Sequence, residues 1–207
     1  EILRVRTYHY KGEVVNTPSF ELELNEELPL DVTDSEEEIS IKSGELTLVI
    51  TKKNWSMTYY RNGEMITRSA GRDLALMKTD FKGFAYNDTD AEETYMRQML
   101  SLSVGELVYG TGERFTPFVK NGQSIDIWNA DGGTSTEQSY KNIPFFITNK
   151  GYGVLVNHPE KVSIEVATEM VTRTEFSVPG GYLDYFLING PTMKEVLTRY
   201  TDLTGKP

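Results

Sequence analysis

The sequence contains no cysteine and only two histidines, His9 and His158. Without cysteine, the chain can form no disulfide bond, no thiolate nucleophile and no cysteine-ligated zinc site. The two histidines have no acidic cluster beside them in the sequence, and two isolated imidazoles make a poor metal site. We therefore expect neither a bound metal nor a cofactor.

Long apolar runs are also missing, and the charge is strongly one-sided. No stretch of 18 apolar residues occurs, so no segment is expected to cross a membrane. Lys and Arg number 21 against 31 Asp and Glu, for a net charge of −10. An acidic protein repels phosphate backbones, which argues against nucleic acid as a partner. Nothing in the composition requires an oxidising compartment, so we expect a cytoplasmic location.

Short strand-like segments dominate what is present. β-Branched and aromatic residues alternate with polar ones, and turn pairs such as Asn62-Gly63 and Asn121-Gly122 separate the segments. This spacing predicts an all-β fold, an antiparallel sandwich or barrel. Strands are expected at 2–10, 20–24, 37–43, 45–51, 56–60, 65–68, 95–103, 106–109, 118–120, 123–128, 143–148, 152–156, 161–167, 172–178 and 182–188, with 69–93 unassigned.

One helix is expected near the C-terminus. Thr192 and Glu195 fit a capping box, and Gly205 followed by Pro207 is typical of a helix end. The apolar residues that fall on one helical face are Met193, Val196, Leu197, Tyr200 and Leu203. This face predicts packing of the helix against the sheet.

A polar loop of about fourteen residues, 129–142, separates two of the expected strands, far longer than a usual hairpin loop. Long loops in compact domains are usually functional or disordered. Asp131 precedes Gly132-Gly133, which can turn sharply. Asp131 could cap its own loop or accept hydrogen bonds from sugar hydroxyls. Trp128, at the loop's base, could lie in the core or stack on a sugar ring.

Four carboxylates near the loop are candidates for chemistry: Glu113, Asp126, Asp131 and Glu137. A glycosidase needs two carboxylates on either side of one bond, and sequence alone cannot place such a pair. A structural ion pair or turn contact is the favoured role for Glu113 beside Arg114.

Several segments carry a family resemblance. Val108-Tyr-Gly-Thr-Gly-Glu-Arg-Phe115 resembles the Val-Tyr-Gly-x-Gly-Glu segment of glycoside hydrolase family 31. The segments Trp128–Gln138, Tyr140–Phe145, Tyr152–Pro159 and 190–207 resemble the α-xylosidase branch of that family. The match is dense in motif residues in the second half of the chain and weak in the first half.

The resemblance implies a fold for this chain and places catalysis in a separate domain. It implies that 1–207 is one N-terminal β-sandwich domain of the galactose-mutarotase-like supersandwich type, ahead of a (β/α)8 catalytic barrel expected after residue 207. The catalytic residues would lie in that barrel, so we expect none here and no hydrolysis by the chain alone. A loop of this domain would reach over the barrel mouth, with Asp131, Trp128 and Thr134 as substrate-binding residues.

The favoured hypothesis is therefore a non-catalytic domain of a retaining α-glycosidase that acts on α-xyloside or α-glucoside oligosaccharides, with an α-xylosidase preferred. Its partner would be its own barrel. A free-standing carbohydrate-binding module and a structural interaction domain are the alternatives. Apolar surface on the C-terminal helix and the 143–158 hairpin is expected to promote self-association.

Overall fold

The computed structural model describes residues 1–12, 18–24, 28–79, 93–130 and 138–206. Within these ranges the chain forms fifteen strands and one helix. The strands are β1 Ile2–Tyr8, β2 Asp31–Asp34, β3 Glu38–Ser43, β4 Leu46–Thr51, β5 Ser56–Arg61, β6 Glu64–Ala70, β7 Leu74–Thr79, β8 Glu93–Ser101, β9 Val108–Gly112, β10 Gln123–Ile127, β11 Asn142–Thr148, β12 Tyr152–Val156, β13 Val162–Val166, β14 Arg173–Pro179 and β15 Tyr182–Asn189. The helix is α1, Met193–Thr204. At 12 residues it is too short to cross a membrane, and it is the only helix among the described residues.

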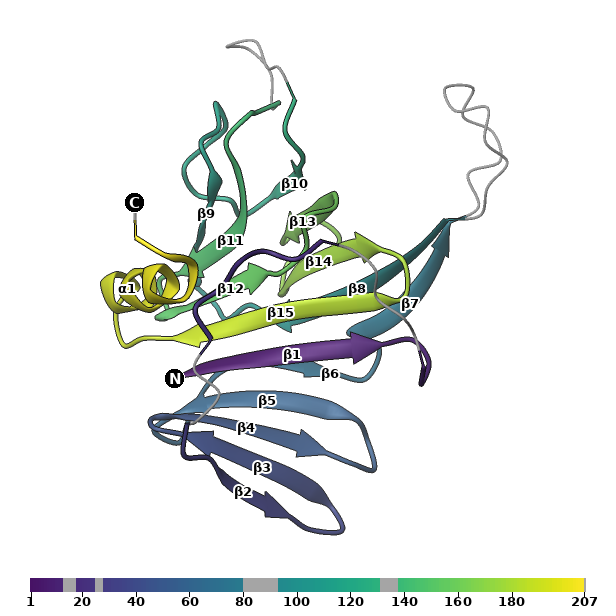
Figure 1. Ribbon diagram of the computed structural model, residues 1–207, viewed down its shortest axis with the longest axis vertical. Coiled ribbons are helices and arrows are strands. Elements are labelled where there is room, and N and C mark those ends of the chain that lie inside the picture. The colour runs from purple at the N-terminus through teal and green to yellow at the C-terminus, as the bar shows by residue number, and fades with distance from the viewer. Residues whose placement is uncertain (13–17, 25–27, 80–92, 131–137, 207) are drawn as a thin grey trace.

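The strands form three antiparallel sheets of five strands each (Figure 1). The first sheet has the order β1-β15-β12-β11-β9, the second β10-β13-β14-β8-β7, and the third β2-β3-β4-β5-β6. One cluster of buried side chains joins all three, with Val154 from the first, Ile164 from the second and Leu46 from the third, each 0% exposed. The expected all-β sandwich is therefore confirmed.

The third sheet is attached to the other two through polar contacts as well as packing. The hydroxyls of Tyr59 and Tyr185 lie 3.0 Å apart in the core. The Thr67 hydroxyl donates to the backbone carbonyl of Ser101 at 2.9 Å, which joins β6 to the end of β8. These contacts satisfy buried polar groups that would otherwise destabilise the core.

Helix α1 covers the outer face of the first sheet. Val196 and Leu203 pack with Phe145 and Phe186 in a second apolar cluster, and the rings of Phe145 and Tyr200 stack at 4.1 Å. A Cβ on Gly190 would lie 2.7 Å from the Val196 nitrogen, so glycine is needed for the helix to approach this closely. The predicted helix and its packing face are confirmed, except at one position.

That exception is Leu197, which is 46% exposed rather than packed. The helix lies against the sheet along the line of Val196 and Leu203, so Leu197 falls at the edge of the contact. The expected Thr192 cap is present, because its hydroxyl oxygen accepts from the Glu195 amide at 3.3 Å. The Glu195 carboxylate accepts from the Thr192 hydroxyl at 2.8 Å.

Two expected strands are wrong, and two unexpected ones are present. Residues 20–24 and 118–120 form no strand; the first instead lies across the end of α1, where the Glu23 amide donates to the Leu203 carbonyl at 2.8 Å. β2 was missed because all four of its residues are exposed, so no apolar alternation marks it. β7 was missed because Leu74-Ala-Leu-Met does not alternate with polar residues.

Arg61 provides a direct test of how the third sheet is held. Its guanidinium donates to the carbonyls of Gly151 at 2.9 Å, Gly190 at 2.8 Å and Lys150 at 2.8 Å. We expect Arg61→Met to lower the free energy of unfolding by about 2–4 kcal/mol, because three carbonyls lose a charged donor. Urea unfolding measures the change. Arg68→Met, at an exposed site on β6, is the control and should change stability little; equal losses for both variants would contradict this role.

Glu175 provides a test of pH dependence on the second sheet. Burial raises the pKa of Glu175 to about 7, although Arg97, 3.9 Å away, acts in the opposite direction. The carboxyl is easier to protonate in the folded protein than in the unfolded one. Its contribution to stability is thus full below a pH of about 4.5 and is lost as pH rises through about 7.

We therefore expect the stability of Glu175→Gln, relative to the parent chain, to increase as the pH is raised from 5 to 8. Chemical unfolding at several pH values measures this difference. Glu38→Gln, at an exposed position on β3, is the control for the change from carboxylate to amide, and an equal pH dependence in both variants would contradict the role of Glu175. A flat profile for Glu175→Gln would show that this carboxyl is already ionised at pH 5.

Candidate functional site

The candidate site lies at the end of the sandwich where the segments after β9 and β10 meet the start of β11. The polar loop predicted from the sequence is described at its two ends, 129–130 and 138–142. Asp131 and Thr134, two of the three predicted substrate-binding residues, and Glu137 lie outside the described residues. Trp128, the third, lies at the loop's base and is 57% exposed. It is therefore not a core residue and is free to contact a ligand.

Asn142 holds the two ends of the loop together. Its amide nitrogen lies 2.9 Å from the Trp128 carbonyl, 3.0 Å from the Asn129 side-chain oxygen and 2.7 Å from the Ser139 carbonyl. The Ala130 amide donates to the same Ser139 carbonyl at 3.0 Å, beside an isolated bridge between Asn129 and Ser139. One side chain therefore fixes where the loop leaves and rejoins the sheet.

Arg114, which follows β9, supports this arrangement. Its guanidinium donates to the Asn142 side-chain oxygen and to the carbonyls of Asp126, at 2.7 Å, and Thr111, at 3.2 Å. Arg114 thus joins β9, β10 and β11 at the base of the loop. The sequence indicated only that Arg114 lies beside Glu113; the positions of its partners depend on three separate strands.

The Gly110-Thr-Gly112 segment serves to bring two strands close together. Both glycines have positive φ, and a Cβ on Gly112 would lie 2.0 Å from the Lys141 carbonyl. Glu113, next along the chain, forms an exposed ion pair with Lys141 at 2.7 Å. The structural role expected for Glu113 is supported, with Lys141 as its ion-pair partner.

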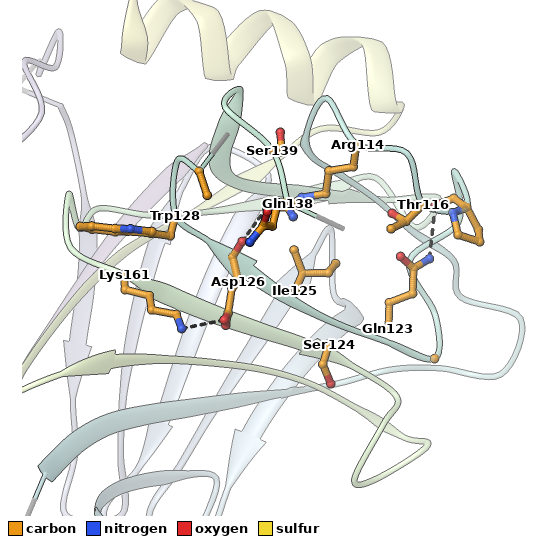
Figure 2. A pocket seen from close by; sticks show the side chains of 13 residues that line it. Arg114, Thr116, Gln123, Ser124, Ile125, Asp126, Trp128, Gln138, Ser139 and Lys161 are labelled. Atoms are coloured by element: carbon orange, nitrogen blue, oxygen red, sulfur yellow. Dashed lines mark hydrogen bonds and ion pairs between the residues drawn. The ribbon is translucent and has the colours of Figure 1, made fainter. Parts of the chain in front are cut away.

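A pocket of about 720 Å³ opens beside this base (Figure 2). Trp128, Asp126 and Lys161 line one side, and the Asp126 carboxylate pairs with the Lys161 amine at 2.6 Å. Ala130 and Gln138, which flank the segment 131–137, also line it. An aromatic ring beside several polar side chains suits a polyhydroxylated ligand. Within the described ranges, no group of three His, Asp or Glu residues is arranged to hold a metal ion.

His158 lies nearby and is only 4% exposed. Its Nε2 accepts from the Asp184 amide at 2.9 Å, as expected for a histidine that binds backbone at a strand end. Burial lowers the pKa of His158, which favours the neutral ring. With Nε2 acting as the acceptor, the ring proton is on Nδ1, which lies 3.2 Å from a Glu160 carboxylate oxygen. His158 thus orients Glu160.

The fold and the loop-end pocket define an all-β sandwich domain with a polar pocket at one end. Sequence comparison makes the assignment specific: the profile of the glycosyl hydrolase 31 N-terminal galactose mutarotase-like domain matches residues 1–165. The chain belongs to this family.

Characterised relatives are much longer proteins. The chain is 44% identical over 190 residues to α-xylosidase XylQ of Lactiplantibacillus pentosus, covering 91% of this chain and 24% of that protein. It is 42% identical over 223 residues to an α-xylosidase of Emericella nidulans, covering 100% of this chain and 28% of that one. The chain therefore spans about a quarter of the length of these relatives.

Solved structures agree with the fold. A Flavobacterium johnsoniae GH31 dextranase superposes with a TM-score of 0.80 at 22% identity, over 100% of this chain and 25% of its own. A GH31 α-xylosidase from a soil metagenome, complexed with xylose, superposes with a TM-score of 0.74 at 19% identity, over 99% of this chain and 31% of its own.

Asn142→Ala tests the organisation of the loop base. The variant removes the donor shared by three acceptors and leaves Arg114 without one of its oxygens. We expect the amides of Ala130, Lys141 and residue 142 to exchange with deuterium at least tenfold faster, because the contacts that close the loop are lost. Hydrogen exchange measures this. Asn54→Ala, at an exposed turn, is the control; unchanged exchange at 130–142 would contradict the role.

Proposed function

We propose that this chain works as the non-catalytic N-terminal domain of a retaining α-glycosidase, an α-xylosidase that removes terminal α-xylosyl residues. The observation that carries the proposal is the match of 42–44% identity to two α-xylosidases over nearly the whole chain, which spans 24–28% of their length. In this proposal the catalytic carboxylates belong to the remaining part of the longer protein.

The role proposed for the domain is to supply the loop 129–142 to the substrate pocket. Arg114 and Asn142 support this role, because they hold both ends of the loop in fixed positions at one edge of the sandwich. The exposed Trp128 at the loop's base supports it as well, since an aromatic ring can stack on a sugar. Asp131 is proposed to accept hydrogen bonds from hydroxyls of the leaving sugar, and Thr134 is proposed as a further substrate-binding residue.

An α-glucosidase is the second candidate for the parent activity. The chain is 27% identical to α-glucosidase 2 of Bacillus thermoamyloliquefaciens over 87% of its length. The higher identity to the α-xylosidases favours xylosides. A free-standing binding module would need a row of exposed aromatics; Phe115 and Tyr140 are each 64% exposed, but they line a different pocket from Trp128. The cytoplasmic location and self-association stay predictions.

Asp131→Ala in the longer α-glycosidase tests the loop's role. We expect kcat/KM to fall about tenfold or more for α-xylosyl disaccharides, because a hydrogen bond to a charged acceptor contributes about 1.5–3 kcal/mol. The fall should be much smaller for p-nitrophenyl α-xyloside, whose leaving group lacks those hydroxyls. Steady-state kinetics on the two substrates measures the difference.

Asp31→Ala, on the exposed strand β2, is the matched control and should leave both substrates unaffected. An equal loss on both substrates, together with a lower melting temperature, would assign Asp131 to the structure of the loop. In that case the loop would not contact the leaving sugar.

A further inference from the structure

A second, smaller pocket shares Trp128 with the first. It has a volume of about 260 Å³, and Trp128 lines both pockets. The other walls come from distant parts of the chain: Phe20, Pro144 on β11, and Glu160 after β12. Every residue that lines this pocket lies within the described ranges, so the pocket does not depend on 131–137.

Two polar side chains of this pocket, Glu160 and Asn129, are each held through one oxygen, which leaves their other polar atom available to a ligand. His158, itself buried, binds one oxygen of Glu160, and no partner for the second oxygen occurs among the described residues. Asn142 donates twice to the side-chain oxygen of Asn129, at 3.0 Å and 3.3 Å. These contacts orient the Asn129 amide and leave its nitrogen, for which the described part of the chain supplies no partner, free to donate.

The remaining walls are apolar and accessible. Trp128 is 57% exposed and Phe20 is 38% exposed, while Pro144 is buried. The pocket therefore combines ring faces with one fixed carboxylate acceptor and one amide donor. An anion would be repelled by Glu160, and a purely apolar ligand would leave both polar groups unsatisfied. A pyranose ring satisfies both, because its C–H face is apolar and its hydroxyls donate and accept.

We propose that this pocket binds a single neutral pyranose unit, stacked on Trp128, with hydroxyl groups bound to the Glu160 carboxylate and the Asn129 amide. The site shares Trp128 with the candidate site described above, but it does not include Asp131 or Thr134, which are assigned above to substrate binding. The choice of a sugar rests in part on the proposed function, whereas the pocket and its polar groups do not.

The test is an NMR titration of the isotope-labelled 207-residue chain with D-xylose and with methyl α-D-xyloside. We expect saturable shifts of the Trp128 indole N–H and the Asn129 side-chain amide, with weak binding in the millimolar range. Glu160→Gln keeps the shape of the side chain and removes its charge, so affinity should fall about tenfold. Phe20→Ala removes one apolar wall and should weaken binding severalfold.

Glu38→Gln, at an exposed position on β3 and outside both pockets, is the matched control that should not change affinity. The proposal is overturned if neither sugar gives a saturable shift, or if Glu160→Gln and Phe20→Ala both bind as tightly as the parent chain. It is also overturned if the shifts centre on residues 123–126 of the larger pocket.

The two proposals can fail separately. If the titration shows no binding at this pocket while Asp131→Ala still affects disaccharides selectively, the proposed function stands and the second sugar site does not. If Asp131→Ala affects both substrates equally while Glu160→Gln weakens sugar binding to the chain, the second site stands alone.

Discussion

Burial of the first sheet on both of its faces is the constraint on which the rest of the structure depends. All five residues of β12 are buried, and so are seven of the eight residues of β15. Strands that are apolar on both faces must pack against other elements on both sides, because burial of apolar surface is the main stabilising contribution to folding. The second and third sheets cover one face, and helix α1 covers part of the other. The loop 129–142 leaves and rejoins the sandwich at one of its ends, where Asn142 contacts Trp128 and Ser139.

Burial on both faces also removes some charged and polar side chains from water, and short buried hydrogen-bond networks satisfy them. Asp184, 1% exposed, accepts from Arg4 at 2.6 Å and from the Asn157 amide at 2.7 Å. Glu106, 3% exposed, accepts from the Tyr152 hydroxyl at 2.7 Å and the Ser103 amide at 2.8 Å. A buried charge without partners would cost several kcal/mol. The Asp184 network also extends to His158, which links the core to the rim of the smaller pocket.

Local patterns in the sequence predict most of the strands, because a half-buried strand alternates with a period of two. β13 follows its predicted alternation, and the Asn62-Gly63 turn has the two positive φ angles that such a hairpin needs. The errors occur where burial does not alternate, as in β2 and β7. They also occur where apolar residues lie on a surface, as at Phe118, which is 79% exposed and packs its ring near Tyr109.

The candidate site was only partly predictable, since its organisation depends on contacts between distant segments. The loop's length and polarity pointed to 129–142, and the family resemblance pointed to Asp131. Neither indicated that Asn142 and Arg114 close the base, because their partners lie on separate segments of the chain. Neither indicated Glu160, which is one acidic residue among many in the sequence. It becomes distinctive only when His158 fixes one of its oxygens beside an exposed tryptophan.

At this end of the domain, the residues at the base of the loop are held by hydrogen bonds, whereas the side chain of Trp128 is exposed. The base residues are tied to β9, β10 and β11 through several hydrogen bonds each, so they move only if the sheets move. Trp128 is attached to this base through its backbone carbonyl, while more than half of its side chain is exposed. The backbone contact keeps the ring at the boundary of the two pockets. Because the same ring lines both pockets, a substitution at Trp128 should affect ligands in either of them, whereas Glu160 and Asp126 each affect one.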